Sequence, residues 1–140
     1  MSRDNDNAGG ARSRRRISTG SPFENAWGYS RLVVDGPFAF VAGTTGYDYA
    51  TMLLPESAAE QARNAWATIG KILREGGFAL EDIVRATYYV TSRNDARAVL
   101  DVCGAVLAGI RPAATVLIVA GLIEPEMKVE IEVTALRNHG

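Results

Sequence analysis

The apolar residues of the first third of the chain follow the short, β-rich pattern of strands. Tyr29 to Asp35 and Phe38 to Thr44 are two such runs, and Gly36-Pro37 separates them. Runs of this kind around a Gly-Pro pair are typical of a β-hairpin. The next stretch, Thr45 to Pro55, has no helix or strand periodicity and is expected to be a loop.

Two longer segments carry apolar residues at helical spacing. The first begins at a capping box, because Ser57 is followed three residues later by Glu60, and Gly76-Gly77 ends it. The second runs from Asp95 to Leu107 and is stopped by Gly109. Two amphipathic helices are therefore predicted.

Three further strands are predicted between and after these helices. Ile83 to Thr91 is rich in Val, Thr and Tyr, Ala113 to Ala120 is almost wholly apolar, and Met127 to Leu136 alternates between apolar and polar residues. The resulting order, ββαβαββ, predicts an α+β domain in which one sheet is backed by two helices.

One face of this predicted sheet needs a partner. The strand from Ala113 to Ala120 is apolar on both faces, and Phe38 to Ala42 is similar. Two helices can cover only one side of such a sheet. In a chain of 140 residues, another copy of the same chain is the most economical cover for the other side.

Charge is unevenly distributed, although the formal net charge is only −1. Residues 1–16 hold five arginines and two aspartates without apolar periodicity, which predicts a disordered leader before a single domain at residues 17–137. The remaining residues hold ten Lys or Arg and fourteen Asp or Glu. An acidic domain repels a phosphate backbone, so its composition argues against extended nucleic-acid binding.

Few residues offer redox, metal or membrane chemistry. Cys103 is the single cysteine, so it forms no internal disulfide, and its apolar neighbours predict an inert buried thiol. His139 is the single histidine, and we find no metal-ligand cluster and no cofactor motif in the sequence. No apolar stretch approaches the roughly 18 residues of a membrane span, and no secretion signal is evident. The cytoplasm is the expected location.

Several segments of the chain resemble the Rid family of enamine and imine deaminases, some of whose members are labelled endoribonuclease L-PSP. The segments are Arg111 to Ala114, Lys128 to Val133, Val41 to Gly43, Gln61-Ala62 and Asp82 to Val84. They lie in the family's order, and the resemblance extends over residues 17–137. It implies a chorismate-mutase-like α+β fold of the bacillus type, assembled as a homotrimer whose sheets face inward.

The resemblance also implies a site, which we carry over residue by residue. Deaminases of the family bind small molecules in pockets at subunit boundaries, where a glutamate orients water and a tyrosine and a serine line the wall. The glutamate corresponds to Glu130 and the tyrosine to Tyr29, whereas Ala42 stands at the serine position beside Gly43. The arginine that grips the substrate carboxylate corresponds to Ala114, so the chain resembles the arginine-lacking subset of the family.

Residue patterns add further candidates to this site. Glu130 and Glu132 project from one face of the last strand, and we expect Glu132 to make a structural pair. Arg31 shares a strand face with Tyr29. Its simplest interpretation is a surface charge, and the alternative is an anion site that replaces the missing arginine. Thr44 either offers its hydroxyl to a ligand or belongs to a simple turn.

Two functions of different classes follow. The first, which we favour, is a hydrolase that acts on small enamines or imines and uses Glu130 to exchange protons with a bound water. The alternative is a non-catalytic trimeric module that binds a metabolite in the same cavities. Ala114 adds weight to the alternative, because a catalytic water is useful only when the substrate is held in line with it. A ribonuclease activity does not fit this acidic chain, which has no core histidine.

Overall fold

A single mixed sheet organises the part of the chain that the structure describes. This computed structural model describes residues 2–3 and 14–138. The strands are β1 (Ser2–Arg3), β2 (Arg14–Ile17), β3 (Leu32–Asp35), β4 (Phe38–Thr44), β5 (Ile83–Val90), β6 (Ala113–Ile118) and β7 (Val129–Leu136). They lie in the order β1-β2-β3-β4-β7-β5-β6. All neighbours are antiparallel except β5 and β6, which are parallel.

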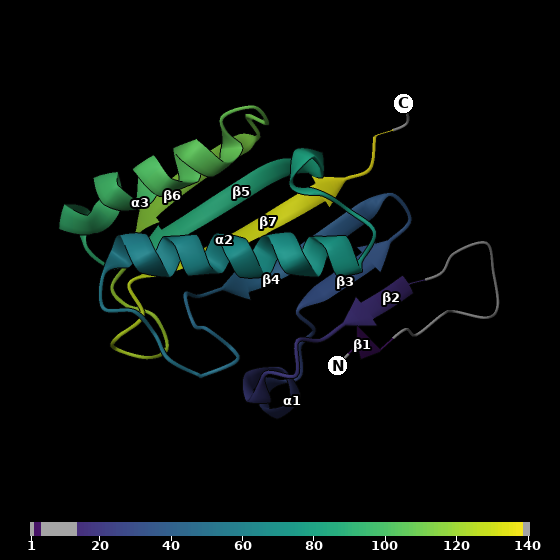
Figure 1. The fold of residues 1–140 in the computed structure, drawn as a ribbon, viewed down its shortest axis with the longest axis horizontal. Coiled ribbons are helices and arrows are strands. Elements are labelled where there is room, and N and C mark those ends of the chain that lie inside the picture. The colour runs from purple at the N-terminus through teal and green to yellow at the C-terminus, as the bar shows by residue number, and fades with distance from the viewer. Residues whose placement is uncertain (1, 4–13, 139–140) are drawn as a thin grey trace.

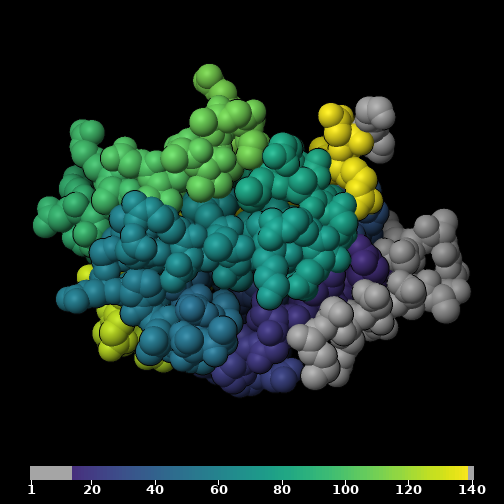
Figure 2. All heavy atoms as spheres, viewed as in Figure 1, coloured from purple at the N-terminus to yellow at the C-terminus, as the bar shows by residue number. Residues whose placement is uncertain are grey.

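Two long helices cover one face of this sheet (Figure 1). The helical segments are α1 (Pro22–Trp27), α2 (Ala58–Glu75), the 3-10 turn η1 (Leu80–Asp82) and α3 (Arg93–Leu107). The Glu60 amide donates to Ser57 Oγ at 3.1 Å, which confirms the predicted start of α2. In the space-filling view from the same side, the atoms of α2 and α3 lie over the sheet (Figure 2). Within the described residues, none of the helices has the length and apolarity that crossing a membrane requires.

The alternation along β7 separates the core from the opposite side of the sheet. Val129, Ile131 and Val133 are buried and belong to the core under the helices. The residues between them point to the other side, which we call the open face. Phe38 and Phe40 of β4 also lie there, with their rings stacked 5.8 Å apart and 40% and 46% exposed. The single chain thus has the uncovered apolar face that the sequence predicts.

Strand β6 forms one edge of the sheet and is the least protected element. Each of its six residues is exposed, although five of them are Ala, Val, Leu or Ile. The sequence predicts a strand as far as Ala120, but the strand ends at Ile118. Its parallel pairing with β5 leaves the other edge of β6 without a neighbour among the described strands.

The beginning of the domain differs from the prediction. Ser2–Arg3 forms β1 and Arg14–Ile17 forms β2, which pairs with it, so the prediction of a disordered leader through residue 16 is wrong for residues 2–3 and 14–16. The Arg14 guanidinium contacts Asp35 of β3 at 2.7 Å, and Ile17 is buried. Residues 4–13 of the predicted leader lie outside the described residues. The strand predicted from Tyr29 starts only at Leu32.

Candidate functional site

The candidate site lies where β4 bulges against β7. Val41 pairs with Val133 and Thr44 with Ile131, so two residues of β4 oppose one residue of β7. The two bulged residues are Ala42 and Gly43. A bulge changes the direction of nearby side chains and leaves backbone groups outside the regular ladder. These groups must find other partners.

Glu130 rests against this bulge from β7. A Cβ atom added to Gly43 would lie 2.7 Å from Glu130 Oε2 and 2.9 Å from its Cδ, so only glycine leaves room for the carboxylate. Burial raises the pKa of Glu130, the positive charge of Arg31 opposes this rise, and Glu132 adds to it. A carboxyl with a raised pKa is a stronger base than an exposed one. Glu130 is therefore the candidate acid and base of the site.

Arg31 lies behind the bulge and is only 2% exposed, so its interpretation as a surface charge is wrong. Its Nη1 donates to the carbonyl oxygens of Ala42 and Gly43, at 3.3 Å and 2.7 Å, and to Thr44 Oγ1 at 2.9 Å. Its Nη2 donates to Tyr29 Oη at 3.2 Å. The guanidinium thus supplies the partners that the bulged backbone needs.

A second buried charge, Glu24 of α1, balances Arg31. Glu24 is 3% exposed, and its Oε2 lies 3.5 Å from Arg31 Nε. Ser18 Oγ donates to Glu24 Oε1 at 2.6 Å, and Thr19 Oγ1 donates to Oε2 at 2.7 Å. Burying a lone charge is strongly unfavourable, so the two residues need one another.

Sequence reasoning misses Glu24, because it lies in an irregular segment with no strand or helix period of sufficient length. The sequence does contain a signal for the short helix that carries Glu24: Ser21 is a helix cap, and Pro22 follows it at the first helical position. That signal fixes the short helix α1. It does not reveal that Glu24 points inward toward Arg31.

Tyr29 and Thr44 reach the site in different ways. Tyr29 is 36% exposed, and its ring centroid lies 5.5 Å from the Arg31 guanidinium carbon. It lines a cavity of about 400 Å³ together with Phe40 and Ala42. Thr44 is fully buried, and its hydroxyl donates to Ala42 O at 2.8 Å. Within the chain, the Thr44 hydroxyl is therefore used by the bulge.

The single chain does not bring Ala114 to Glu130, and Glu130 does not line the cavity that Tyr29 and Ala42 share. Ala114 pairs with Ala86 of β5, which is buried under the helices. Glu130 pairs with Tyr89, three residues further along β5. Because paired residues share a face and residues three apart in a strand do not, Ala114 points to the helix side and Glu130 to the open face.

Neighbouring side chains behave as the sequence predicts. Tyr89 Oη donates to Glu132 Oε1 at 2.6 Å, so Glu132 makes a structural pair. Cys103 is buried and accepts a hydrogen bond from Trp66 Nε1 at 3.4 Å, and burial raises the pKa of its thiol. His139 lies outside the described residues.

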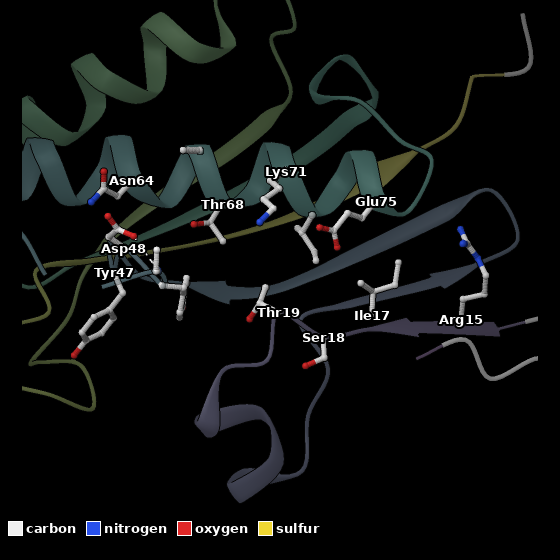
Figure 3. Close-up of a pocket in the computed structure, with 14 residues that line it drawn as sticks. Arg15, Ile17, Ser18, Thr19, Tyr47, Asp48, Asn64, Thr68, Lys71 and Glu75 are labelled. Atoms are coloured by element: carbon white, nitrogen blue, oxygen red, sulfur yellow. Dashed lines mark hydrogen bonds between the residues drawn. The ribbon is translucent and has the colours of Figure 1, made fainter. Parts of the chain in front are cut away.

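A larger cavity of about 780 Å³ lies on the helix side, between β2 and α2 (Figure 3). Thr68, Lys71 and Glu75 of α2 line one wall, and Ser18 and Thr19 line the other. No residue that the sequence predicts for the site lines this cavity. It is nevertheless connected with the site, because the Ser18 and Thr19 hydroxyls hold Glu24.

Comparisons with known proteins agree with this fold. The family described as Endoribonuclease L-PSP matches residues 19–137. A Capra hircus protein named 2-iminobutanoate/2-iminopropanoate deaminase is 33% identical over 125 residues, which cover 89% of this chain and 90% of that protein.

Solved structures lead to the same family. A Mycobacterium tuberculosis member of the YjgF/YER057c/UK114 family is 40% identical, has a TM-score of 0.82, and is matched over 89% of this chain and 99% of that one. The YjgF gene product of E. coli is 28% identical, has a TM-score of 0.75, and is matched over 80% and 90% of the two chains. The fold, the sequence match and these structures together show that the chain belongs to the Rid family, also described as endoribonuclease L-PSP or YjgF/UK114.

Proposed function

We propose that this protein is a small-molecule hydrolase that deaminates enamines or imines at pockets between the subunits of a homotrimer. The observation that carries the proposal is the Glu130 carboxylate, which rests against Gly43 on the open face with its pKa raised by burial. Relatives named 2-iminobutanoate/2-iminopropanoate deaminase support the reaction class. The free, buried thiol of Cys103 is compatible with a reducing compartment, and we propose the cytoplasm.

In the proposed reaction, water adds to the carbon of a C=N bond. Glu130 takes a proton from the attacking water and passes it to the nitrogen, which gives a carbinolamine. It then moves the hydroxyl proton of this carbinolamine to the amino group, so that the C–N bond breaks and a carbonyl compound and ammonia leave. Tyr29 and the backbone at Ala42 and Gly43 form the wall that holds the substrate. Arg31 belongs to this wall rather than to the substrate contacts, because its Nη atoms already donate to Ala42, Gly43, Thr44 and Tyr29.

The substrate class follows from position 114. Ala114 corresponds by resemblance to the carboxylate-gripping arginine of the family's deaminases, and we propose that the chain belongs to the arginine-lacking subset. A bidentate guanidinium-carboxylate pair is the strong part of such recognition. We therefore propose substrates without an α-carboxylate.

Ammonia release from neutral imines tests this proposal directly. The wild-type protein should accelerate the release, and Glu130→Gln should remove the acceleration without changing the thermal stability by more than about 1 kcal/mol. Equal rates for the two proteins would contradict a catalytic role for Glu130.

The second candidate function is binding without turnover. Ala114 favours it, because a site that lacks a guanidinium has less means of holding a substrate in line with a water. Calorimetric binding of a carbonyl compound or amine that is lost in Glu130→Gln, with no turnover of any imine, would identify a metabolite-binding module.

A further inference from the structure

We propose that Arg31 and Glu24 are positioning residues: the buried pair fixes the bulge of β4 against which the Glu130 carboxylate rests. The inference rests on the proposed function of Glu130. It adds to the candidate site two residues that do not touch the substrate. Contacts connect Glu24 to Arg31, Arg31 to the bulge, and the bulge to Glu130.

The first step leads from Arg31 to the bulge. Regular pairing between β4 and β7 is interrupted between Val41 and Thr44. The carbonyls of Ala42 and Gly43 accept hydrogen bonds from a single nitrogen, Arg31 Nη1, with the shorter contact of 2.7 Å made to Gly43. Hydrogen bonds from a charged donor are about twice as strong as neutral ones. Arg31 therefore replaces the missing ladder and defines the bulge conformation.

The second step leads from the bulge to Glu130. A Cβ atom on Gly43 would lie 2.7 Å from Glu130 Oε2, so the glycine backbone forms one wall of the carboxylate's position. If the bulge relaxed by about an ångström, the Gly43 backbone would move toward the Glu130 carboxylate or away from it. The orientation of the carboxylate thus depends on the contact between Arg31 and Gly43 O.

The third step leads from Arg31 to the opposite side of the sheet. Glu24 Oε2 lies 3.5 Å from Arg31 Nε, and Arg31 Nε has no hydrogen-bond partner among the described residues. Ser18 and Thr19, which line the helix-side cavity (Figure 3), donate to both carboxylate oxygens of Glu24. Glu24 is held in place by these hydroxyls and in turn holds Arg31.

The charges around Glu130 predict the direction in which its pKa shifts when Arg31 is removed. Arg31 is the cation that lowers the pKa of Glu130, whereas burial and Glu132 of the same strand raise it. Tyr89 of β5 also faces Glu130, and the Glu130 charge contributes to the raised pKa of that phenol. Removing Arg31 while the site stays buried should raise the pKa of Glu130 further. If the pair only stabilised the fold, its loss would admit water and lower that pKa.

A titration of the Glu130 carboxyl carbon by NMR tests the proposal without requiring turnover. The first variant is Glu24→Gln/Arg31→Met, which removes both buried charges together. The second is Arg31→Lys, which keeps the positive charge but loses the planar guanidinium and its two donor nitrogens. Arg14→Met, which removes the exposed ion pair with Asp35 at the other end of β3, is the matched control. We expect the double variant to raise the pKa of Glu130, and the control to leave it unchanged.

Arg31→Lys separates position from charge. We expect the pKa of Glu130 to change less than in the double variant, while the amide nitrogen shift of Thr44 moves because the Gly43 carbonyl loses its charged donor. A lowered or unchanged Glu130 pKa in the double variant would overturn the proposal. If the double variant does not fold, an unchanged Thr44 amide shift in Arg31→Lys would overturn it as well. Failure of the imine assay alone would concern the proposed function and leave this titration intact.

Discussion

The space beside Gly43 is large enough for the Glu130 carboxylate or for a side chain at position 43, but not for both. The carboxylate fills the volume in which any other residue at position 43 would place its Cβ. The overlap involves the far end of a flexible glutamate and no backbone atom, so a larger residue would displace the carboxylate before it disturbed the fold. At the residue scale, the requirement for glycine therefore concerns the orientation of Glu130.

Gly43→Ala should separate stability from activity. We expect the free energy of unfolding to change by about 1 kcal/mol or less, because the glutamate can swing away. The proposed imine hydrolysis should fall by about a hundredfold, because small misplacements of a catalytic group have large effects. Gly104→Ala in α3 is the control, since nothing lies near its added Cβ. Loss of activity in both variants, or in neither, would contradict this account of Gly43.

The identity of residue 114 should determine whether amino-acid-derived imines are hydrolysed. The wild-type protein should barely accelerate the hydrolysis of imines that a dehydratase releases from serine or threonine. A charged hydrogen bond contributes roughly 1.5–3 kcal/mol, so the missing clamp corresponds to about a hundredfold or more in rate. Ala114→Arg should restore turnover, and adding Glu130→Gln should abolish it again, as measured by ketoacid formation.

The location of Ala114 adds a control to this experiment. Since Ala114 and Glu130 point to opposite faces of one chain, the introduced arginine is expected to serve a neighbouring subunit. Mixing the inactive Ala114→Arg/Glu130→Gln protein with wild type should then produce activity that neither has alone. Wild-type turnover at the level of an arginine-bearing relative would contradict the whole prediction.

Among the elements, β2 connects the N-terminal segment to the rest of the fold. It extends the sheet beyond β3, and Ile17 contributes its side chain to the core. Arg15 Nη2 donates to the Gly76 carbonyl at the end of α2, at 2.7 Å. These contacts join β2 to the helix layer, and Arg15 and Ile17 also line the helix-side cavity.

Two truncations should therefore behave differently. A protein that starts at Arg14 should melt close to the full chain, whereas one that starts after Ile17 should melt about 5–10 °C lower. The difference arises because burial of one isoleucine contributes about 1.5–3 kcal/mol, in addition to the lost strand pairing. Differential scanning calorimetry of both proteins measures it. Equal melting temperatures would mean that β2 contributes nothing to stability.

The sequence predicts the elements with a clear period and misses those without one. Both long helices and strands β4 to β7 could be located, because their apolar residues repeat at helical or strand spacing. Strand β2 has the sequence Arg-Arg-Arg-Ile, in which a single apolar residue defines no period. The candidate site could be proposed from Tyr29, Gly43 and Glu130, which resemble family residues. Burial of Arg31 was not accessible, because it depends on α1 returning Glu24 to the same point.

At the scale of the whole molecule, the open face is the side of the sheet that no helix of the described residues covers. Phe38 and Phe40 lie exposed on it, and Leu117 of β6 pairs with Tyr89 on the same side. Exposed apolar side chains on an uncovered sheet face are typical of an interface between copies. The proposed trimer buries this face and brings neighbouring chains to the Glu130 sites.

Light scattering should give a particle of about 45 kDa, three times the chain mass of 15.0 kDa. Leu117→Asp should dissociate or unfold it, because a buried, unpaired charge costs several kcal/mol. Leu100→Asp is the matched control, since Leu100 is similarly exposed but lies on α3 in the helix layer. A stable monomer of wild-type protein at micromolar concentration would remove the basis for a shared site.

The exposure of β6 also has a consequence for how much of the protein is active in a cell. In the proposed trimer, this strand is protected only after three chains have met, so folding and assembly form one equilibrium. While most chains are unassembled, the fraction of chains that belong to trimers then rises with the square of the chain concentration. Expression level would act as a threshold: sparse chains would be cleared by proteases, and a modest increase in synthesis would yield a disproportionate gain in working sites.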